Sequence, residues 1–499
     1  RSTPKPSSAA SDVYKRQDEA YVYIIGKHSR VEFYKITRTI RTYSGKKRYS
    51  EYEIPYNSLT DSVVMLSAYT VNGKDTVFVT DEEVNDITHP DVEGAPAFSY
   101  IKMKVINFPA VTRGSVIHLE YAISRRDIID NSLLFVFGDW SSAENISLNV
   151  YYNDENTPLD VYVLNDQRYE IRDVKGESLA YADRIGNLFD VDVRRVTKVL
   201  VATREDAPAV SRELNMPALC YIHPSIFVSA NGGLDSLLKN IRVEGALSDS
   251  IYNEILRISN RRGEGFVDDL YDFILRNFSV NTSIPVAYQP KGARKCDEVF
   301  MSRYGSTYDL SILFLSVLRK IGLKAYLYLT VTERSLPDSV VLHLPSLAFF
   351  RKMGVMVVTG EDQTLYDFTS PYMEKDFTGI ENPPILIVGN RGGKGTAFYK
   401  GKWEGGKPNV GKYVWDVKVG RDMSSVVIRF ISEEEGNLAK RRRARYKGLQ
   451  GRKLLLEYEQ EMKRLYPGVK SYKKEPVIKN LDSRDAPVSY THLTLPTKA

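Results

Sequence analysis

Cysteine is almost missing from this 499-residue chain, which holds only Cys220 and Cys296. The two are 76 positions apart, too far for a Cys-x-x-Cys redox or zinc motif. A single disulfide and two buried free thiols both fit such a pair, so the sequence leaves the redox state open. Histidine is scarce as well. The six histidines are scattered with no His-x-x-x-His pairing, and we expect neither a metal site nor a cofactor.

Long apolar runs are also absent. No run approaches the roughly 18 residues that a membrane-crossing helix needs, so we expect no transmembrane segment. The net charge of +6 is small for this length and does not indicate nucleic acid as a partner. What remains is an ordinary globular composition, with 42% hydrophobic and 26% charged residues. At roughly 150 residues per domain, about three domains are expected.

Both ends of the sequence differ from the rest. Residues 1–17 (RSTPKPSSAASDVYKRQ) and 488–499 (VSYTHLTLPTKA) resemble translated sequencing-adapter sequence, as found at the ends of truncated metagenomic genes. We therefore expect non-native ends at 1–17 and 488–499 and leave both out of the fold prediction. A native signal peptide would have preceded Asp18, and the sequence does not define the true native termini.

Residues 18–230 carry a period-two pattern, which predicts β-strands. Within residues 115–123, apolar side chains occupy every second position: Ile117, Leu119, Tyr121 and Ile123. Asn72-Gly73 stands between two strand-like runs, a strong hairpin signal. The 33 tyrosines and 19 phenylalanines of the chain also favour β-structure. We predict an N-terminal antiparallel β-sandwich over residues 18–230.

The pattern becomes helical near Asn231, and residues 231–385 are predicted to form an α+β core. The most apolar helix is expected at residues 308–321, and such a helix must be buried on all sides. Ser306 and Asp309 form an S-x-x-D capping pair at its start, and Gly322 suits a left-handed stop. Strand-like runs follow at residues 324–331, 354–358 and 364–367.

Residues 386–487, after Pro383-Pro384, are predicted to form a C-terminal β-rich domain. Strand-like alternation appears at residues 414–419 and 425–431, and a helix is expected at 454–465. The predicted fold class is therefore multidomain α+β, with β-rich domains on either side of the α+β core.

The sequence around the apolar helix resembles the nucleophile segment of the transglutaminase-like family. There, a helix begins at a Gly-Asp-Cys-Lys-Asp-type motif, and the helix N-terminus lowers the pKa of the cysteine thiol. Here, Gly305-Ser306-Thr307-Tyr308-Asp309 puts Thr307 at the position of the nucleophilic cysteine. The resemblance implies a papain-like α+β core over residues 231–385.

Two further segments are similar to motifs of this family. PSLAFFRK, at residues 345–352, places Lys352 where the family has its catalytic histidine. Leu365-Tyr366-Asp367-Phe368-Thr369 retains the family aspartate as Asp367. In addition, NFPAVTRGSVIHLEYAIS at residues 107–124 resembles part of the β-rich domain of unknown function that commonly precedes the core in bacterial members.

These substitutions predict a catalytically inactive protein. A threonine hydroxyl is a far weaker acid than a thiol and needs an adjacent base before it can attack. Lys352 could act as that base only with a lowered pKa, and Asp367 would raise it. We therefore interpret Ser306 and Thr307 as helix-capping residues and predict a Lys352–Asp367 ion pair. The leading hypothesis is a binding or scaffold module for a peptide, a protein or a cell-surface ligand, and the resemblance implies a periplasmic or secreted protein.

Two other functions stay open at this point. An active hydrolase or acyl transferase could use Thr307 or Cys296, although Cys296 is better interpreted as a small buried hydrophobe. The basic run at residues 440–453 could bind a polyanion, against the simpler interpretation of a solvated helix face balanced by Glu433, Glu434 and Glu435. The ligand and the oligomeric state do not follow from the sequence.

Overall fold

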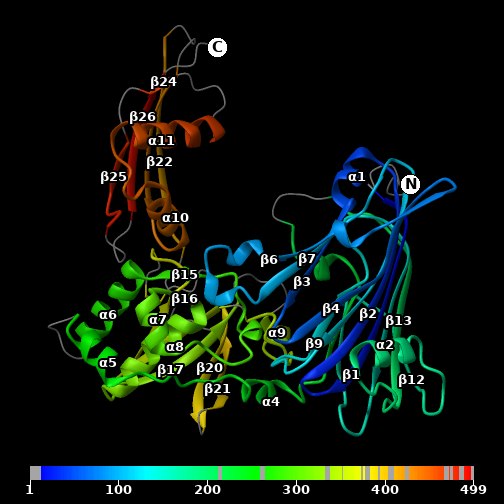
Figure 1. Cartoon of the computed structure of the whole chain (residues 1–499). Helices are drawn as coiled ribbons and strands as arrows, with labels where there is room; N and C mark the ends of the chain where they lie inside the picture. Colours follow the sequence, from blue (N-terminus) through cyan, green and yellow to red (C-terminus); the bar gives the residue numbers. More distant parts are fainter. Residues whose placement is uncertain are drawn as a thin grey trace.

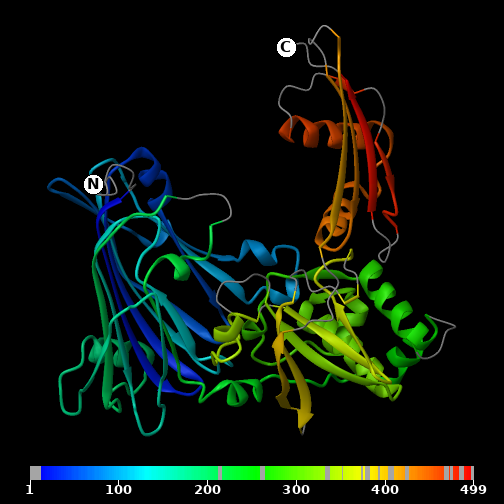
Figure 2. The ribbon, with the colours of Figure 1, turned by 180° about the vertical axis from the view of Figure 1, so that it is seen from behind.

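The computed structural model describes most of the chain. The described residues are 13–211, 216–258, 264–331, 338–350, 352–372, 375–376, 382–391, 394–402, 409–421, 426–465, 471–472, 476–482 and 488–495. Figures 1 and 2 show a multidomain, β-rich protein: the N-terminal sheets lie on one side, the α+β core beside them, and the C-terminal unit rises from the core. The predicted multidomain α+β class is confirmed at this level.

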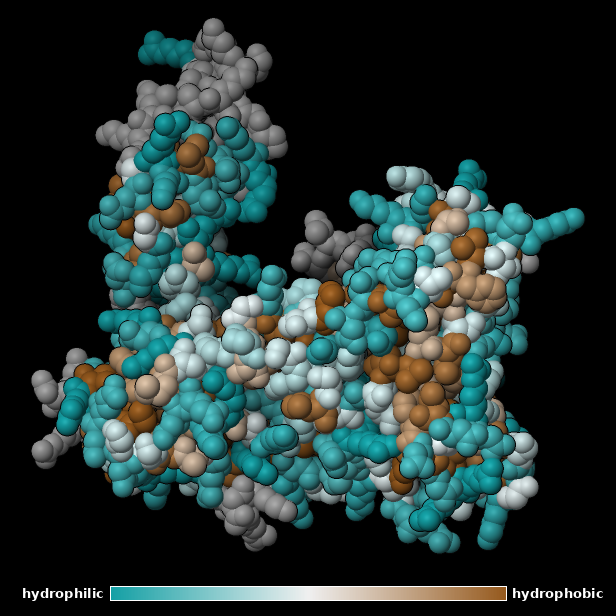
Figure 3. Space-filling view, in the orientation of Figure 1, coloured by the Kyte–Doolittle hydropathy of each residue, from teal (hydrophilic) through white to brown (hydrophobic). Residues whose placement is uncertain are grey.

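The N-terminal domain is built on one eight-stranded sheet. Apolar side chains of one face of β8 (Val116–Arg125), namely Ile117, Leu119, Tyr121 and Ile123, are all buried, as their alternation predicts. Apolar residues also gather on the visible face of this domain (Figure 3). The strand order is β12 (Glu170–Asp173), β13 (Lys198–Ala207), β10 (Ala143–Tyr152), β1 (Val13–Gly26), β2 (Ser29–Ile40), β8, β4 (Asp61–Asn72) and β5 (Asp75–Phe78).

Two three-stranded sheets complete the N-terminal domain. Their orders are β3 (Glu51–Asn57), β7 (Ile101–Asn107), β6 (Val84–Thr88) and β11 (Asp160–Leu164), β14 (Ser225–Ser229), β9 (Ser132–Val136). Helices α1 (Tyr43–Tyr49), α2 (Ala182–Phe189) and α3 (Leu219–Ile222) lie in the connections. The predicted hairpin exists: Asn72 ends β4 and pairs with Asp75 of β5, and Gly73 has a positive φ of 63°.

The prediction of a purely antiparallel N-terminal domain was wrong for one strand pair, because β1 and β10 pair in parallel. The chain leaves β1 through β2 and returns to its other side only after β9, and this long crossover permits a parallel pair. Residues 13–17 belong to β1 and residues 488–495 form β26, so parts of both segments excluded from the fold prediction are strands in the structure.

The core has a five-stranded sheet with helices packed on one face. The order is β19 (Asp362–Asp367), β18 (Lys352–Thr359), β17 (Lys324–Thr330), β20 (Pro384–Arg391) and β21 (Lys394–Lys402). The helices are α4 (Leu234–Leu238), α5 (Asp249–Leu256), α6 (Glu264–Asn277), α7 (Cys296–Ser302), α8 (Thr307–Lys320) and α9 (Asp338–Val341), and the short strands β15 (Ser279–Asn281) and β16 (Tyr304–Ser306) pair in parallel.

The predicted boundary between residues 385 and 386 falls inside β20 and was wrong. Proline is compatible with the first position of a strand, and Pro384 occupies that position in β20. β20 then pairs with β17, and β21 pairs with β20, so the core sheet continues to Lys402. The Pro383-Pro384 sequence therefore marks the start of a strand rather than the end of a domain.

Helix α8 is the centre of the core and agrees with its prediction. Most of its residues are buried, in contact with α6, β17 and β18. Ser306 and Asp309 form the predicted capping box, and Gly322 follows the helix with a left-handed φ of 87°.

The C-terminal unit combines a second five-stranded sheet with two helices. Its main order is β22 (Gly411–Val419), β23 (Val426–Glu434), β26 (Val488–Leu495) and β24 (Ser471–Tyr472), with β25 (Val477–Lys479) also on β26. The helices are α10 (Asn437–Tyr446) and α11 (Gly451–Leu465), and α11 contains the predicted helix at 454–465. Across the described parts of the chain, no helix is long and apolar enough to span a bilayer.

Candidate functional site

Thr307 is the first residue of α8 and lies in a polar turn that is nearly closed to solvent. The Ser306 hydroxyl accepts a hydrogen bond from the Asp309 backbone N–H (3.1 Å) and donates to Oε1 of Gln289 (2.7 Å). In return, Oδ2 of Asp309 accepts from the Ser306 backbone N–H (3.0 Å). The Thr307 side chain is also buried. Ser306 therefore acts as the capping residue that the sequence predicts.

Asp309 has a second role in holding the segment that precedes α8. Its Oδ1 accepts hydrogen bonds from the Gln289 amide (3.1 Å) and the Arg294 backbone N–H (2.8 Å). Burial raises the pKa of Asp309, although these donors act against that effect. A buried carboxylate with three hydrogen-bond donors explains how an acidic residue is tolerated at the start of the core helix.

Lys352 and Asp367 form the predicted ion pair. The Lys352 ammonium lies 3.0 Å from Oδ2 of Asp367, and the two side chains are only 10% and 2% exposed. Oδ1 of Asp367 accepts a hydrogen bond from the Thr369 backbone N–H at 2.7 Å. The carboxylate thus has partners on both oxygens, and the pair is part of the interior of the core.

Strand register places the ion pair at the same end of the core as Thr307. After the turn at Gly322, β17 runs back along α8, and both elements are about 20 Å long. The last residue of β17, Thr330, is therefore level with the start of α8. Thr330 is the register partner of Lys352, and Asp367 is the partner of nearby Gly354.

The side chains of the pair nevertheless point away from α8. Tyr366 on β19 packs against Phe314 of α8, and Met353 on β18 lies in the same apolar core. Because side chains alternate along a strand, Lys352 and Asp367 project from the opposite face. No hydrogen bond joins Thr307 to either residue in the described structure. The structure thus brings together two of the three predicted positions.

On that opposite face, Tyr328 lies against the ion pair. Its hydroxyl is buried, with no hydrogen-bond partner among the residues that the structure describes. A Cβ at Gly354 would lie 2.5 Å from the Tyr328 ring, so only glycine fits between the ring and the sheet. Burial and the nearby Asp367 carboxylate both raise the pKa of Tyr328. The face around the ion pair is therefore tightly packed.

Sequence reasoning missed the contribution of Lys440 from α10. Burial, and then the ammonium of Lys352, lower the pKa of Lys440, while Asp367 acts in the opposite direction. In the same region, the Lys447 ammonium lies over the Tyr372 ring at 5.8 Å. The C-terminal unit therefore contacts the core beside the ion pair. No local signal in the sequence links α10 to this position, because the contact is tertiary.

The PSLA motif holds the core against the N-terminal domain. The Pro345 carbonyl accepts hydrogen bonds from the Ser229 hydroxyl (3.0 Å) and the Asn231 amide (2.7 Å). Oδ2 of Asp130 accepts from the Ser346 hydroxyl (3.0 Å) and the Leu347 backbone N–H (2.6 Å). This motif therefore has a structural role in this chain, and its last residue, Ala348, lies four positions before Lys352, the first residue of β18.

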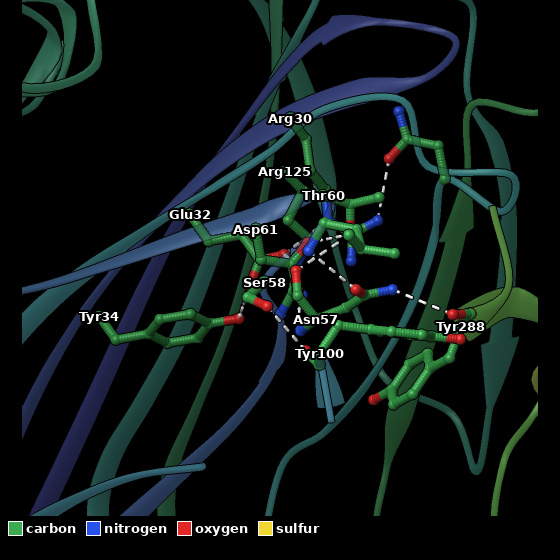
Figure 4. A network of polar contacts seen from close by, with 12 residues as sticks. Arg30, Glu32, Tyr34, Asn57, Ser58, Thr60, Asp61, Tyr100, Arg125 and Tyr288 are labelled. Atoms are coloured by element: carbon green, nitrogen blue, oxygen red, sulfur yellow. Dashed lines mark hydrogen bonds and ion pairs between the residues drawn. The ribbon is translucent and has the colours of Figure 1, made fainter. Parts of the chain in front are cut away.

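A buried network of charges lies on the N-terminal side of the same junction (Figure 4). Oε1 of Glu32 accepts hydrogen bonds from Nε of Arg30 (2.6 Å) and Nε of Arg125 (2.7 Å). Burial alone would raise the pKa of Glu32, but the two guanidinium groups outweigh it and lower the pKa to about 2. The glutamate is thus ionised at neutral pH despite complete burial.

This network continues to Tyr288, in the segment that precedes α7. Arg125 pairs with Asp61, and Oδ2 of Asp61 accepts from the Asn57 backbone N–H at 3.1 Å. The Asn57 amide then donates to the Tyr288 carbonyl at 3.1 Å, as Figure 4 shows. Tyr288 directly precedes Gln289, which bonds the Ser306 cap. Polar contacts therefore run from the N-terminal sheet to the start of α8.

Neither cysteine is placed as a nucleophile. Cys220 and Cys296 are both buried, and they are present as two thiols rather than as a disulfide. Burial raises the pKa of the Cys296 thiol to about 11, and its sulfur lies 3.6 Å from the Ser316 hydroxyl. The interpretation of Cys296 as a small buried hydrophobe is confirmed. Among the described residues, no group of three histidine, cysteine or acidic side chains is arranged to hold a metal.

The basic run at residues 440–453 is partly neutralised within the protein. Arg442 pairs with Glu434 (3.0 Å) and Glu461 (2.9 Å), and Arg445 pairs with Glu457 (2.7 Å). Of the three glutamates expected to balance this run, Glu434 pairs with one of its arginines. The other two partners, Glu457 and Glu461, lie on α11 and were not predicted. These contacts favour a structural role over polyanion binding.

A match to a domain family and a likeness to one solved structure agree with this architecture. Residues 27–209 match DUF3857, a domain of unknown function with a solved structure. No curated protein matches the chain. A crystal structure of a candidate protease from Parabacteroides distasonis is 17% identical, with a TM-score of 0.60, over 76% of this chain and 70% of that one. A candidate cysteine protease from Cytophaga hutchinsonii is 9% identical, over 70% and 78% of the two chains, with a TM-score of only 0.18.

These comparisons define the protein at the level of its fold. This chain carries a DUF3857 domain before an α+β core, and its fold is similar over most of its length to that of the Parabacteroides protein. At 17% identity, this likeness establishes the architecture and leaves the chemistry to the residues of the core.

Proposed function

We propose that this protein is a catalytically inactive relative of the transglutaminase-like family, acting as a binding or scaffold module for a peptide or a cell-surface ligand. The three motif segments around Thr307, Lys352 and Asp367 occur in the family order, and the likeness to the Parabacteroides protein supports a shared architecture. On this proposal, the papain-like core extends from residue 231 to Lys402, and the protein works in the periplasm or outside the cell.

The observation that carries the proposal is the buried Lys352–Asp367 pair. The Lys352 ammonium donates to the Asp367 carboxylate at 3.0 Å, and both side chains project from the sheet face opposite α8, so Lys352 is not placed to accept the proton of the Thr307 hydroxyl. Thr307 is thus left without a base, and its neighbour Ser306 is committed to the helix cap. Cys296 offers no replacement, because its thiol is buried and its pKa is raised.

Covalent probes can test the inactivity. We expect native protein to remain unlabelled by a fluorophosphonate, which reacts with activated hydroxyls, and by a vinyl sulfone, which reacts with thiolates, when intact mass is measured at pH 7.5. Thr307→Ala is the matched control. Stoichiometric labelling that disappears in Thr307→Ala, together with peptide-amide cleavage lost in the same variant, would establish an active hydrolase instead.

The binding role needs a separate measurement. A peptide array and an array of bacterial cell-wall fragments would be probed with the folded protein, and we expect retention of one class of ligand. Thr307→Arg, which places a long cation at the start of α8, is expected to weaken that retention if the ligand occupies the position of the family's active site. Retention of no species by the wild type would contradict the binding role while leaving the catalytic conclusion intact.

A further inference from the structure

Strand β22 forms a long open edge in the C-terminal sheet. Its strand neighbour is β23, and no other strand pairs with it within the described part of the chain. All nine residues of β22 are exposed, and its pairing with β23 has no register shift. Proteins usually keep edge strands short, interrupt them with bulges or cover them with another element, because a long exposed edge can pair with another chain.

On β22, the odd-numbered residues direct their backbone hydrogen-bonding groups away from β23. Just before the strand, the Val410 carbonyl accepts from the Glu435 backbone N–H at 2.8 Å, so these two residues form a hydrogen-bonded pair. Such pairs alternate along an antiparallel ladder. The even residues of β22 therefore bond β23, and the odd residues, from Gly411 to Val419, direct their N–H and C=O groups to the open edge.

The same odd positions carry apolar side chains on one face. Tyr413, Trp415, Val417 and Val419 are 47%, 46%, 52% and 53% exposed. Trp415 contacts Phe430 of β23, with ring centroids 4.5 Å apart, so the stripe continues from the buried core of the unit to the open edge. An added strand would bury these side chains while satisfying the outward backbone groups.

The opposite face supplies the charge that selects the partner. It presents Lys412, Asp416 and Lys418 at even positions, together with the exposed Val414. Lys412 lies 3.4 Å from Glu433 of β23, but both side chains of this pair are largely exposed, so the lysine still presents its charge to solvent. If two copies paired antiparallel with full overlap about Trp415, each Lys412 would face Lys418 of the other copy. Like charges directly opposite are destabilising, whereas an acidic residue facing each lysine is favourable. The edge is thus suited to a strand that differs from β22 itself.

We propose that β22 is a strand-addition site for an extended segment of a partner protein. The segment has apolar residues at alternate positions and acidic residues opposite Lys412 and Lys418. Its main-chain groups bond the odd residues of β22, which gives affinity, and its side chains give specificity. This site lies in the C-terminal unit and does not depend on the function proposed for the core.

A synthetic peptide provides the direct test. The fluorescent probe Val-Glu-Val-Lys-Val-Thr-Val-Glu-Val places glutamate opposite both lysines and lysine opposite Asp416 when it pairs antiparallel. We expect saturable anisotropy binding to the full chain. Hydrogen-exchange mass spectrometry should show protection of residues 411–419. Val417→Pro removes one outward N–H without breaking the ladder to β23 and should weaken binding at least tenfold.

The controls separate backbone pairing from charge and from misfolding. Val417→Thr keeps the N–H and should bind within threefold of the wild type. Lys418→Glu should weaken the probe severalfold and improve binding of a variant peptide whose glutamates are lysines. Circular dichroism and thermal unfolding must match for all variants. Equal binding of a scrambled peptide, or no binding at all, would overturn the proposal. The proposal would also be overturned if the wild-type protein formed a dimer and Val417→Pro abolished it, because a second copy would then occupy the edge.

Discussion

The Lys352 ammonium and the Asp367 carboxylate lie 3.0 Å apart on adjacent strands of the core sheet, and both are almost fully buried. Removing two charges from water is costly, and their attraction compensates only when the geometry is good and further hydrogen bonds are made. The Thr369 backbone N–H supplies such a bond to Asp367. The pair therefore acts as a structural connection between β18 and β19, at the two positions that the sequence resemblance compares with a catalytic histidine and aspartate.

Replacing Lys352 with methionine should destabilise the core strongly. The substitution keeps much of the side-chain volume but leaves Asp367 as an unpaired buried charge, which costs about 3 kcal/mol. Chemical denaturation followed by circular dichroism would measure the loss. The double variant Lys352→Met/Asp367→Asn removes the orphaned charge and should recover part of the stability. A single variant as stable as the wild type would contradict a structural role for the pair.

Local features of this core could be predicted from the sequence, and tertiary ones could not. The cap at Ser306, the stop at Gly322 and the burial of α8 depend on residues within one segment, where spacing alone carries the information. The joining of β20 to β17 and the proximity of Lys440 to Lys352 depend on pairings between distant segments. The Lys352–Asp367 pair was predictable only because the family motifs align both positions.

The contacts between the N-terminal domain and the core were likewise not predictable from the sequence. PSLA could be recognised as a motif, but its anchor Asp130 lies 216 residues before Ser346 and has no signal of its own. Likewise, the alternation in the N-terminal region identified strands, while the parallel pairing of β1 with β10 arises from the path of the chain between them. Hydrophobic period specifies which face of a strand is buried, and it does not specify the neighbouring strand.

Asp130→Ala should loosen the attachment of the core to the N-terminal domain. The variant leaves the Leu347 backbone N–H without its acceptor and removes further bonds to Ser346 and Asn231. Hydrogen bonds to charged groups contribute about 1.5–3 kcal/mol each, so we expect thermal unfolding in two separated steps and faster limited proteolysis. Ser132→Ala, which removes one hydroxyl contact to Ser346, should cost no more than about 1 kcal/mol. Identical behaviour of the two variants would argue against a dominant role for Asp130.

Glu32 should make stability dependent on pH in the acidic range. Because Arg125 and Arg30 lower its pKa to about 2 in the folded protein, its contribution is fully present above the unfolded pKa near 4.5 and is lost as the pH falls towards 2. The contribution is about 3 kcal/mol at neutral pH. The stability difference between the wild type and Glu32→Gln should shrink between pH 5 and 2. A constant difference across that range would show that the glutamate charge is not responsible.

Cys296 should resist thiol reagents in the folded protein. Its side chain is 1% exposed, its pKa is raised to about 11, and thiolate is the reactive form. Incubation with iodoacetamide at pH 7.5, followed by intact-mass measurement, should leave both cysteines unmodified, and both should react in 6 M guanidinium chloride. Rapid native labelling at Cys296, abolished in Cys296→Ser, would restore it as a candidate nucleophile.

Arg442 should stabilise the C-terminal unit and contribute little to polyanion binding. It pairs with Glu434 and Glu461, whose side chains are almost fully buried, so Arg442→Met leaves two carboxylates without that partner and should cost about 3 kcal/mol. Arg441 is the matched control, since it is the next residue along α10, has the same charge and is exposed. Arg441→Met should leave stability within about 0.5 kcal/mol of the wild type. If the run at 440–453 bound polyanions, both substitutions would instead weaken heparin retention at low salt by similar amounts, with little difference in stability between them, because either would remove one positive charge from the interface.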